Sequence, residues 1–476
     1  MNTDAPWPTA AAAEARVLKI QTKLHQWTTD DPNRRFDDLD NLISDPAFLV
    51  MAWKRVRGNR GARTAGVDGE TAYYVTARLG EEKFLTDLRV KLKARTFQPR
   101  PVRERMIPKP GGKRRMLGIA TVRDRVVQAA LKLVLEPIFE ADFKPCSYGF
   151  RPGRRAHDAI AEIHYFCSRS YEWVVEGDIK ACFDEIDHSA LLGRVRKRVG
   201  DRRVLDLVKA FLKAGILGED GVERDTNTGT PQGGILSPLL SNIALSVLDE
   251  HFAEAWERVP SWAREQRRRK GLANYRLIRY ADDFVALVAG TRAHAESLRE
   301  EAAAVLRTMG LVLSETKTRI AHIDEGFDFL GFRIQRQQER GATKHYVYTY
   351  PRKAALAAIK AKVRKLCQGT LNQKLTVLLN RMNSVLRGWT NYFRYGVPKA
   401  TFAYLSAFVW RRVIRWLCRK HPQRNWKWLR GRYLQGWWPR EGRVALFKTT
   451  LVGSIRYSYR RDDSIPSPWS LSMGST

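Results

Sequence analysis

Residues 279–284 read Arg-Tyr-Ala-Asp-Asp-Phe, with two adjacent acids between apolar neighbours. Apolar residues 277–278 precede it and apolar residues 285–288 follow it. Two apolar runs around a pair of acids predict a buried β-hairpin whose turn presents Asp282 and Asp283 side by side. Burial of two adjacent anions is costly unless a cation neutralises them. Taken alone, the stretch indicates either a metal-binding turn or an ordinary acidic turn.

A second acid favours the metal-binding interpretation. Asp178 ends the β-rich run 172–177 and is followed by a predicted helix. An aspartate at a strand end and an aspartate pair on a hairpin can meet around two divalent ions about 3.5–4 Å apart, which is the arrangement for in-line attack on a phosphoryl group. Mg²⁺ suits such a site because it prefers oxygen ligands and is shared between carboxylates and substrate phosphates. We therefore expect Asp178, Asp282 and Asp283 to hold two Mg²⁺ ions.

The charge of the chain indicates its partner. The 476 residues include 84 Lys and Arg against 50 Asp and Glu, a formal net charge of +34. Such an excess favours nucleic acid, because Lys and Arg that neutralise phosphates release counterions. A highly charged soluble surface and an anionic lipid surface are the alternatives. The sequence shows neither a run of about 18 apolar residues nor a secretory leader, so we expect a cytoplasmic protein with no membrane partner.

Further blocks of sequence occur in a fixed order around the acids. Residues 147–154 read Ser-Tyr-Gly-Phe-Arg-Pro-Gly-Arg, residues 229–238 read Gly-Thr-Pro-Gln-Gly-Gly-Ile-Leu-Ser-Pro, and residues 329–332 read Phe-Leu-Gly-Phe. Together with the acidic hairpin, they resemble the palm motifs of reverse transcriptases encoded by group II introns. Residues 386–393, Leu-Arg-Gly-Trp-Thr-Asn-Tyr-Phe, resemble the maturase domain of that family. The resemblance extends over nearly the whole chain.

The resemblance implies an α+β fold of the right-hand polymerase type. Fingers and a palm with an antiparallel sheet would be followed by an all-helical thumb, also called the maturase domain. The expected domains are an N-terminal extension with a basic RNA-binding loop (1–75), fingers and palm (76–335), thumb (336–450) and a C-terminal tail (451–476). DNA binding is the hypothesis for the tail. The sequence after Cys418 lacks the clustered Cys and His residues of the endonuclease that many members carry, so we expect no endonuclease domain.

The family resemblance also assigns the catalytic centre. It implies that Asp178, Asp282 and Asp283 are the catalytic metal ligands and that the backbone carbonyl of Ile179 is a further ligand. Asp184, a short distance along the chain, is interpreted as an acid at the start of a helix rather than as a ligand.

Five residues are expected, from the same resemblance, to bind the incoming deoxynucleoside triphosphate (dNTP). Lys109 and Arg115 would grip the triphosphate, Lys as a point charge and Arg as a planar fork. Phe183 would lie under the sugar and exclude a 2′-hydroxyl. Gln232 would contact the nucleotide and orient the template, and Lys317 would give a proton to the pyrophosphate leaving group.

Basic and aromatic residues near both ends are expected to bind intron RNA. Eight of the 14 tryptophans lie after residue 385, interleaved with arginines. Aromatic rings among guanidinium groups suit stacking on splayed bases and contact with phosphates. The expected RNA contacts are Asn59, Arg60 and Arg63 in the N-terminal loop and Arg387, Trp389, Tyr392, Arg411, Arg412 and Arg415 in the thumb.

The function that follows from these observations is that of an RNA-directed DNA polymerase. It would use dNTPs to extend a DNA primer on an RNA template. It would also bind its own group II intron RNA to promote splicing and support intron movement into target DNA by target-primed reverse transcription, as a ribonucleoprotein at the nucleoid. The alternatives are a free-standing relative in phage defence or DNA repair, and a polymerase-inactive RNA-binding splicing factor. The three intact aspartates argue against the inactive form.

Overall fold

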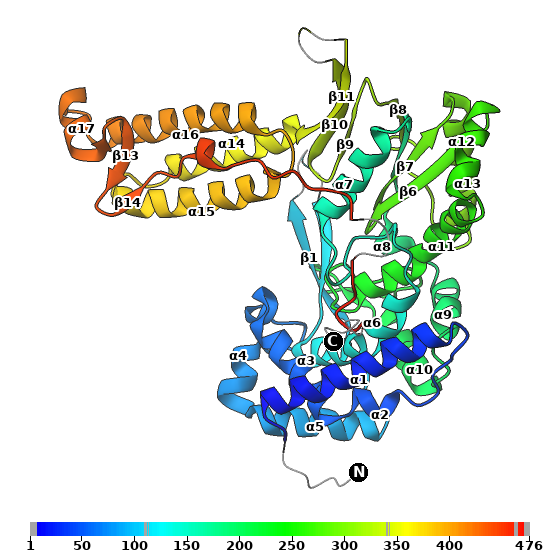
Figure 1. Ribbon diagram of the computed structural model, residues 1–476. Coiled ribbons are helices and arrows are strands. Elements are labelled where there is room, and N and C mark those ends of the chain that lie inside the picture. Colours follow the sequence, from blue (N-terminus) through cyan, green and yellow to red (C-terminus); the bar gives the residue numbers. More distant parts are fainter. Residues whose placement is uncertain are drawn as a thin grey trace, which may run out of the picture.

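The computed structural model describes residues 7–108, 112, 114–338, 341, 343–460 and 465–470. Figure 1 shows a helical lower part, a palm above it and a long arm that projects to one side. These parts correspond to the N-terminal region with the fingers, the palm and the thumb. Within the described ranges, no helix combines the length and the apolar character needed to cross a bilayer.

The N-terminal helices share a core with the palm. Long helices α1 (Ala10–Asp30), α3 (Pro46–Gly58) and α6 (Val122–Asp142) pack against one another. Helix α6 is buried along most of its length and is the centre of this core. The shorter elements of the region are α2 (Asp40–Ile43), η1 (Arg60–Arg63), α4 (Ala72–Tyr74), η2 (Val75–Leu79) and α5 (Glu81–Lys93).

The fingers carry a β-hairpin. Strands β1 (Val102–Pro108) and β2 (Arg114–Ile119) pair in antiparallel fashion, as the sequence predicts for this region. Short strands β4 (Ile216–Leu217) and β5 (Glu223–Arg224) extend the sheet in the order β2-β1-β4-β5.

The palm is built on an antiparallel sheet, which confirms the predicted fold class. Its strand order is β6 (Asn274–Tyr280), β7 (Asp283–Ala289), β3 (Trp173–Asp178) and β8 (Arg319–His322). Both faces of the sheet are covered, which explains why β7 reads as a continuous apolar run. The palm helices are α7 (Ala156–Cys167), α8 (Cys182–Glu185), α9 (His188–Arg196), α10 (Arg202–Leu212), α11 (Ser237–Glu257) and α13 (Arg292–Arg307).

The thumb has its own hydrophobic core. A sheet of β9 (Phe327–Phe329), β10 (Phe332–Gln338) and β11 (His345–Pro351) leads into it. Its helices are α14 (Lys353–Gln368), α15 (Leu375–Phe393), α16 (Lys399–Lys420) and α17 (Trp426–Tyr433). The expectation of an all-helical thumb is wrong in one respect, because a small sheet of β12 (Leu434–Gln435), β13 (Trp438–Glu441) and β14 (Val444–Ala445) closes its outer end. Gly436 and Gly442, both at positive φ, form the tight turns of this sheet.

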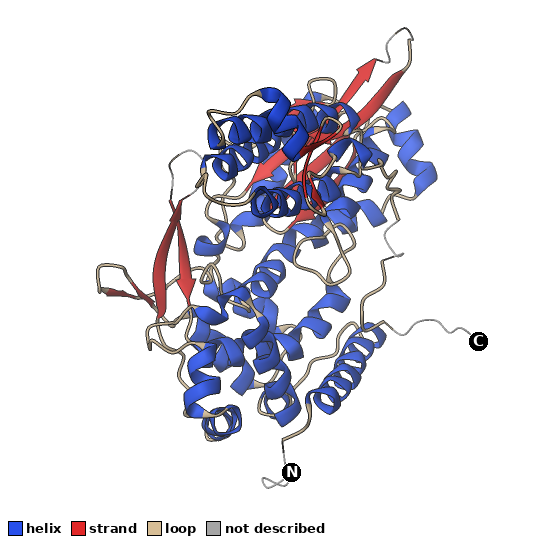
Figure 2. Ribbon diagram, turned by 90° about the vertical axis from the view of Figure 1, so that its left-hand side faces the viewer, coloured by secondary structure: helices blue, strands red, loops and turns tan. Residues whose placement is uncertain are grey.

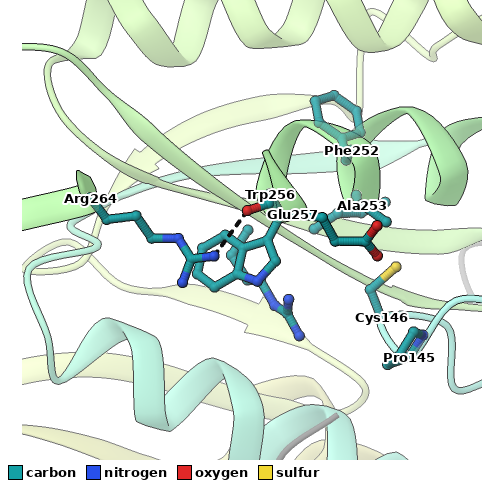
Figure 3. A pocket seen from close by; sticks show the side chains of 9 residues that line it. Pro145, Cys146, Phe252, Ala253, Trp256, Glu257 and Arg264 are labelled. Carbon is teal, nitrogen blue, oxygen red and sulfur yellow. Dashed lines mark hydrogen bonds between the residues drawn. The ribbon is translucent and has the colours of Figure 1, made fainter. Parts of the chain in front are cut away.

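Residues 256–275 form a charged insertion at the edge of the palm. Helix α12 (Ser261–Arg269) keeps every residue exposed or half-buried. The Arg264 guanidinium lies 3.4 Å from the centroid of the Trp256 ring and donates a hydrogen bond to the Trp256 carbonyl at 2.9 Å (Figure 3). This contact fastens the insertion to the end of α11.

The C-terminal tail runs from the thumb back across the palm. After η3 (Thr449–Leu451), the Tyr457 hydroxyl donates to Asp158 of α7 at 2.6 Å. The tail then reaches α1, where the buried Trp469 indole donates to Gln21 at 3.2 Å. Figure 2 shows the C-terminal segment and the β1–β2 hairpin on opposite sides of the molecule. The tail therefore connects the thumb, the palm and the N-terminal helices on the side away from the fingers hairpin.

Candidate active site

Two of the three predicted catalytic aspartates are paired on neighbouring strands of the palm sheet. The register pairs Asp178 of β3 with Asp283 of β7, so their side chains lie on the same face of the sheet. Tyr280 pairs with Asp283, which leaves Ala281 and Asp282 as the two-residue turn of the predicted hairpin. Ala281 has φ 58°, in the left-handed region that such tight turns require.

A buried arginine holds this turn from beneath. Arg279 is fully buried and forms a two-pronged ion pair with Asp249 of α11. Its guanidinium also donates to the Ala281 carbonyl at 2.8 Å and to the Asn242 side chain at 3.0 Å. Gly149, in the Ser-Tyr-Gly-Phe block, passes so close that a Cβ there would lie 2.2 Å from the Ala281 nitrogen. The position of the catalytic turn is therefore fixed by residues from three separate segments.

The electrostatics of the site favour a divalent cation. The pKa of Asp283 is raised to about 6, most strongly by burial and then by the neighbouring charges of Asp282 and Asp178, against a smaller opposing effect of Lys317 and Arg352. Lys317 and Arg352 therefore only partly offset the effects of burial and of the two neighbouring carboxylates, and the site lacks further positive charge. Two divalent ions would supply that charge, so the residues present fit the metal site that reverse transcriptases use.

Lys317 lies at the same site. Its ammonium is 2.8 Å and 3.1 Å from the two carboxylate oxygens of Asp178. Within the described parts of the chain, no three His, Cys, Asp or Glu side chains stand close enough together to hold an ion by themselves. Asp178, Asp282 and Asp283, which are all described, therefore form no three-ligand cluster, and a bound ion here would need further ligands such as substrate phosphates. The β-bridge between Ile179 and Leu313 is formed by backbone N–H and C=O groups of the residues next to them in sequence. It does not use the Ile179 carbonyl, which is compatible with the predicted role of that carbonyl as a metal ligand.

A chain of hydrogen bonds joins the fingers hairpin to the palm. The Arg115 guanidinium donates to Gln232 at 2.6 Å, and the Gln232 amide donates to the Asp184 carboxylate at 2.7 Å. The structure thus brings together two predicted nucleotide ligands and adds Asp184, which the sequence interpretation left as a helix-start acid. Lys109, the other predicted fingers ligand, lies outside the described residues.

Phe183 lies beside the loop that carries Gln232. Its side chain is 9% exposed, and its ring meets the edge of the Phe150 ring at a centroid distance of 6.5 Å. The Thr230 amide donates to the Phe183 carbonyl at 2.6 Å, which fixes the loop against this residue. The role of Phe183 in sugar selection stays a prediction.

Comparisons with known proteins decide the family. Residues 107–334 match the family "Reverse transcriptase (RNA-dependent DNA polymerase)" and residues 356–434 match "Group II intron, maturase-specific domain". The chain belongs to the group II intron reverse transcriptases.

Relatives extend over much of this reverse transcriptase. It is 39% identical to Protein YkfC of Escherichia coli K12 over 376 residues, which are 73% of this chain and 97% of YkfC. It is 34% identical to the group II intron-encoded protein LtrA of Lactococcus lactis over 366 residues, 67% of this chain and 60% of LtrA. An uncharacterized 91 kDa protein in a cob intron of Schizosaccharomyces pombe is 28% identical over 473 residues, which are 87% of this chain and 58% of that protein. The chain thus spans about three fifths of the last two relatives.

The predicted RNA contacts of the reverse transcriptase divide into exposed and packed side chains. Asn59, Arg60 and Arg63 are exposed around a hollow of about 610 Å³. On the thumb, Arg411 and Arg415 are exposed. These five residues are available to an RNA surface.

The other four predicted RNA contacts share their side chains with packing. The exposed Arg387 lies 4.4 Å from the centroid of the Phe447 ring, and the half-buried Arg412 lies 5.4 Å from that of the Phe408 ring. Trp389 is half-buried against the Phe393 ring at 4.6 Å, and the Tyr392 hydroxyl donates to the Leu330 carbonyl at 2.8 Å. RNA binding by these residues stays a prediction.

The sequence interpretation missed the residues that position the catalytic turn. Asn242 and Asp249 lie seven residues apart on α11, so they share one face of the helix, and both are buried. Arg279 interrupts the apolar run of β6. A buried charge needs a partner. Polar residues seven positions apart on α11 and a charged residue in a buried strand were therefore the sequence signal for this contact.

Proposed function

We propose that this reverse transcriptase copies RNA into DNA at Asp178, Asp282 and Asp283 with two bound Mg²⁺ ions. The observation that supports the proposal is the pairing of Asp178 with Asp283 beside the turn that presents Asp282. Bound Mg²⁺ would lower the pKa of the primer 3′-hydroxyl and stabilise charge on the attacking and leaving oxygens.

Residues around the aspartates would bind and orient the incoming dNTP. Arg115, held at Gln232, is placed to grip the triphosphate with a planar fork of donors. Phe183 would close the space under the sugar and so exclude ribonucleotides. Lys317, at the Asp178 carboxylate, would donate a proton to the pyrophosphate as it leaves.

The thumb supports the second part of the proposal, which is intron RNA binding. It matches a domain described as maturase-specific, and a relative named Nuclear intron maturase 1 of Arabidopsis thaliana is 28% identical over 294 residues. We infer that the thumb and the N-terminal loop bind the chain's own intron RNA and promote its splicing. The same ribonucleoprotein would then copy the intron into target DNA, and it would reside at the nucleoid.

Primer extension on an RNA template with Mg²⁺ tests the catalytic part. Asp282→Asn should abolish extension and leave the affinity for intron RNA within a few-fold of the parent, because one ligand is removed without a change in the RNA-binding surfaces. Asp206→Asn on α10, an exposed aspartate, is the matched control and should extend normally. A comparable loss of RNA affinity in Asp282→Asn would show that the site is misplaced.

The splicing part is tested through the RNA that copurifies with the chain. We expect a group II intron RNA whose splicing the protein accelerates. Robust primer extension without any intron RNA or splicing effect would favour a free-standing reverse transcriptase. RNA binding without extension by folded parent protein would leave only the splicing-factor alternative.

A further inference from the structure

A second large hollow lies on the palm, away from the catalytic aspartates. Its volume is about 1290 Å³, and its walls come from α7, β11, residues 395–397 after α15 and tail residues 454–459. Glu172, at its edge, immediately precedes β3, whose other end carries Asp178. At about 3.3 Å per residue, this places the hollow roughly 20 Å along the strand from Asp178. We call it the tail-side cleft.

The walls of the tail-side cleft are rich in rings and positive charge. Six tyrosines and three arginines line it. Among the described lining residues, Glu172 is the only carboxylate, and it already pairs with the lining residue Arg336. The cleft is therefore positive overall. This charge suits a polyanion and disfavours a cationic partner.

Two features of the walls suit unpaired bases. The Arg169 guanidinium lies 3.6 Å from the centroid of the Tyr165 ring, so an arginine and a tyrosine already form a stacked platform. Tyr346, on the adjacent strand β11, is 45% exposed. Arg456 of the tail is exposed beside them. Rings that accept stacked bases next to guanidinium groups that meet phosphates are the common means of binding single strands.

The size of the cleft argues for an extended polymer. Pockets for small ligands measure about 300–1,000 Å³, and this one is larger. Residues 395–397, which form part of its wall, belong to the region 356–434 that matches the maturase-specific domain. The cleft is thus continuous with the part of the chain that is proposed to bind intron RNA.

We propose that the tail-side cleft holds a single-stranded segment of the bound RNA, with bases stacked on Tyr346 and the Arg169–Tyr165 platform and phosphates at Arg456. This inference rests on the proposed function, because it assigns part of the RNA-binding surface of the same ribonucleoprotein. It gives the tail a role as one wall of an RNA site.

Binding of a labelled oligouridine tests the proposal, with a saturating RNA template–DNA primer present to fill the catalytic site. Tyr346→Ala should weaken binding about tenfold, since stacking contributes about 1–3 kcal/mol per base, and Tyr346→Phe should restore it. Arg456→Ala should lower the salt slope by about 0.7, the value for one phosphate, and Arg169→Ala should weaken binding because it removes the stacked guanidinium. The same oligonucleotide with 4-thiouridine should crosslink to peptides of β11 and the tail.

The matched control removes two arginines elsewhere. Arg292→Ala with Arg299→Ala changes two exposed arginines of α13 and should leave oligouridine affinity near that of the parent. Equal weakening in this control, or unchanged binding in the cleft variants, would overturn the inference. Equal or tighter binding of oligothymidine would overturn the assignment to RNA. Variants of the tail-side cleft should keep normal primer extension. If the parent protein itself neither extends primers nor binds RNA, the proposed function fails instead of this inference.

Discussion

At the scale of single residues, the catalytic centre depends on a few exact contacts between segments distant in sequence. Arg279 holds the turn of Asp282, and Gln232 joins the fingers residue Arg115 to Asp184. Sequence motifs predict the groups that act on substrate. The groups that hold them in place become visible only when the chain is folded, because their partners are 30 to 117 residues away.

Phe183 is predicted to select the sugar of the incoming nucleotide. Phe183→Ala should admit ribonucleotides, because removal of the ring opens the space that a 2′-hydroxyl needs. The measurement is the ratio of kcat/KM for a dNTP and the matching ribonucleotide, which should fall at least tenfold. Phe150→Ala, which removes the ring that Phe183 contacts, is the neighbouring control and should alter the ratio less. Unchanged sugar discrimination in Phe183→Ala would contradict the steric role.

Asp184 is predicted to position Gln232 for the nucleotide. A hydrogen bond to a charged group contributes about 1.5–3 kcal/mol, so Asp184→Ala should lower kcat/KM for dNTPs about tenfold, mainly through KM. Asp184→Asn keeps an oxygen acceptor and should lose less. Steady-state primer extension over a range of dNTP concentrations checks both. A fall in kcat without a change in KM would instead place Asp184 among the catalytic ligands.

At the scale of elements, helix α6 combines capping with a buried acid. Thr121 caps the helix, and Asp124 accepts the Thr121 hydroxyl at 2.7 Å while only 2% of Asp124 is exposed. Burial raises the pKa of Asp124 from 3.8 to about 6, against the lowering effect of the hydrogen bonds from Thr121 and Arg100. Asp124, at the start of the helix, therefore binds a proton more readily in the folded state than in the unfolded state.

This shift predicts a pH dependence of stability. Between pH 3.8 and about 6, the folded chain keeps a proton on Asp124 that the unfolded chain has lost, so the free energy of unfolding falls as pH rises through this window. At 1.36 kcal/mol per pKa unit, the loss is about 3 kcal/mol and is complete above pH 6. Asp124→Asn cannot ionise, so its stability relative to the parent should rise by that amount between pH 4 and pH 6.5. Denaturant unfolding at each pH measures it, and a pH-independent difference would contradict the shift.

At the scale of the whole molecule, most of the architecture was predictable and most of the connections between its parts were not. The apolar runs on both sides of Asp282 and Asp283 predict the palm hairpin, and the family resemblance of residues 386–393 implies the thumb. The closing sheet at residues 434–445 was missed because its strands have two to four residues, too few for an alternating pattern. The path of the tail to Gln21 was also missed, since a contact between residues 448 apart leaves no local signal.

The net charge of +34 gives the last prediction. RNA binding by the whole chain should weaken steeply with salt, with a slope of about −0.7 to −0.9 per phosphate neutralised. The slope counts released counterions, so it should shrink when exposed arginines of the RNA surfaces, such as Arg411 and Arg415, are changed to Ala together. It should not shrink in Asp282→Asn, which removes no positive charge. Titration of intron RNA at several salt concentrations gives the slope directly, and a flat response would show that the positive charge does not contact phosphates.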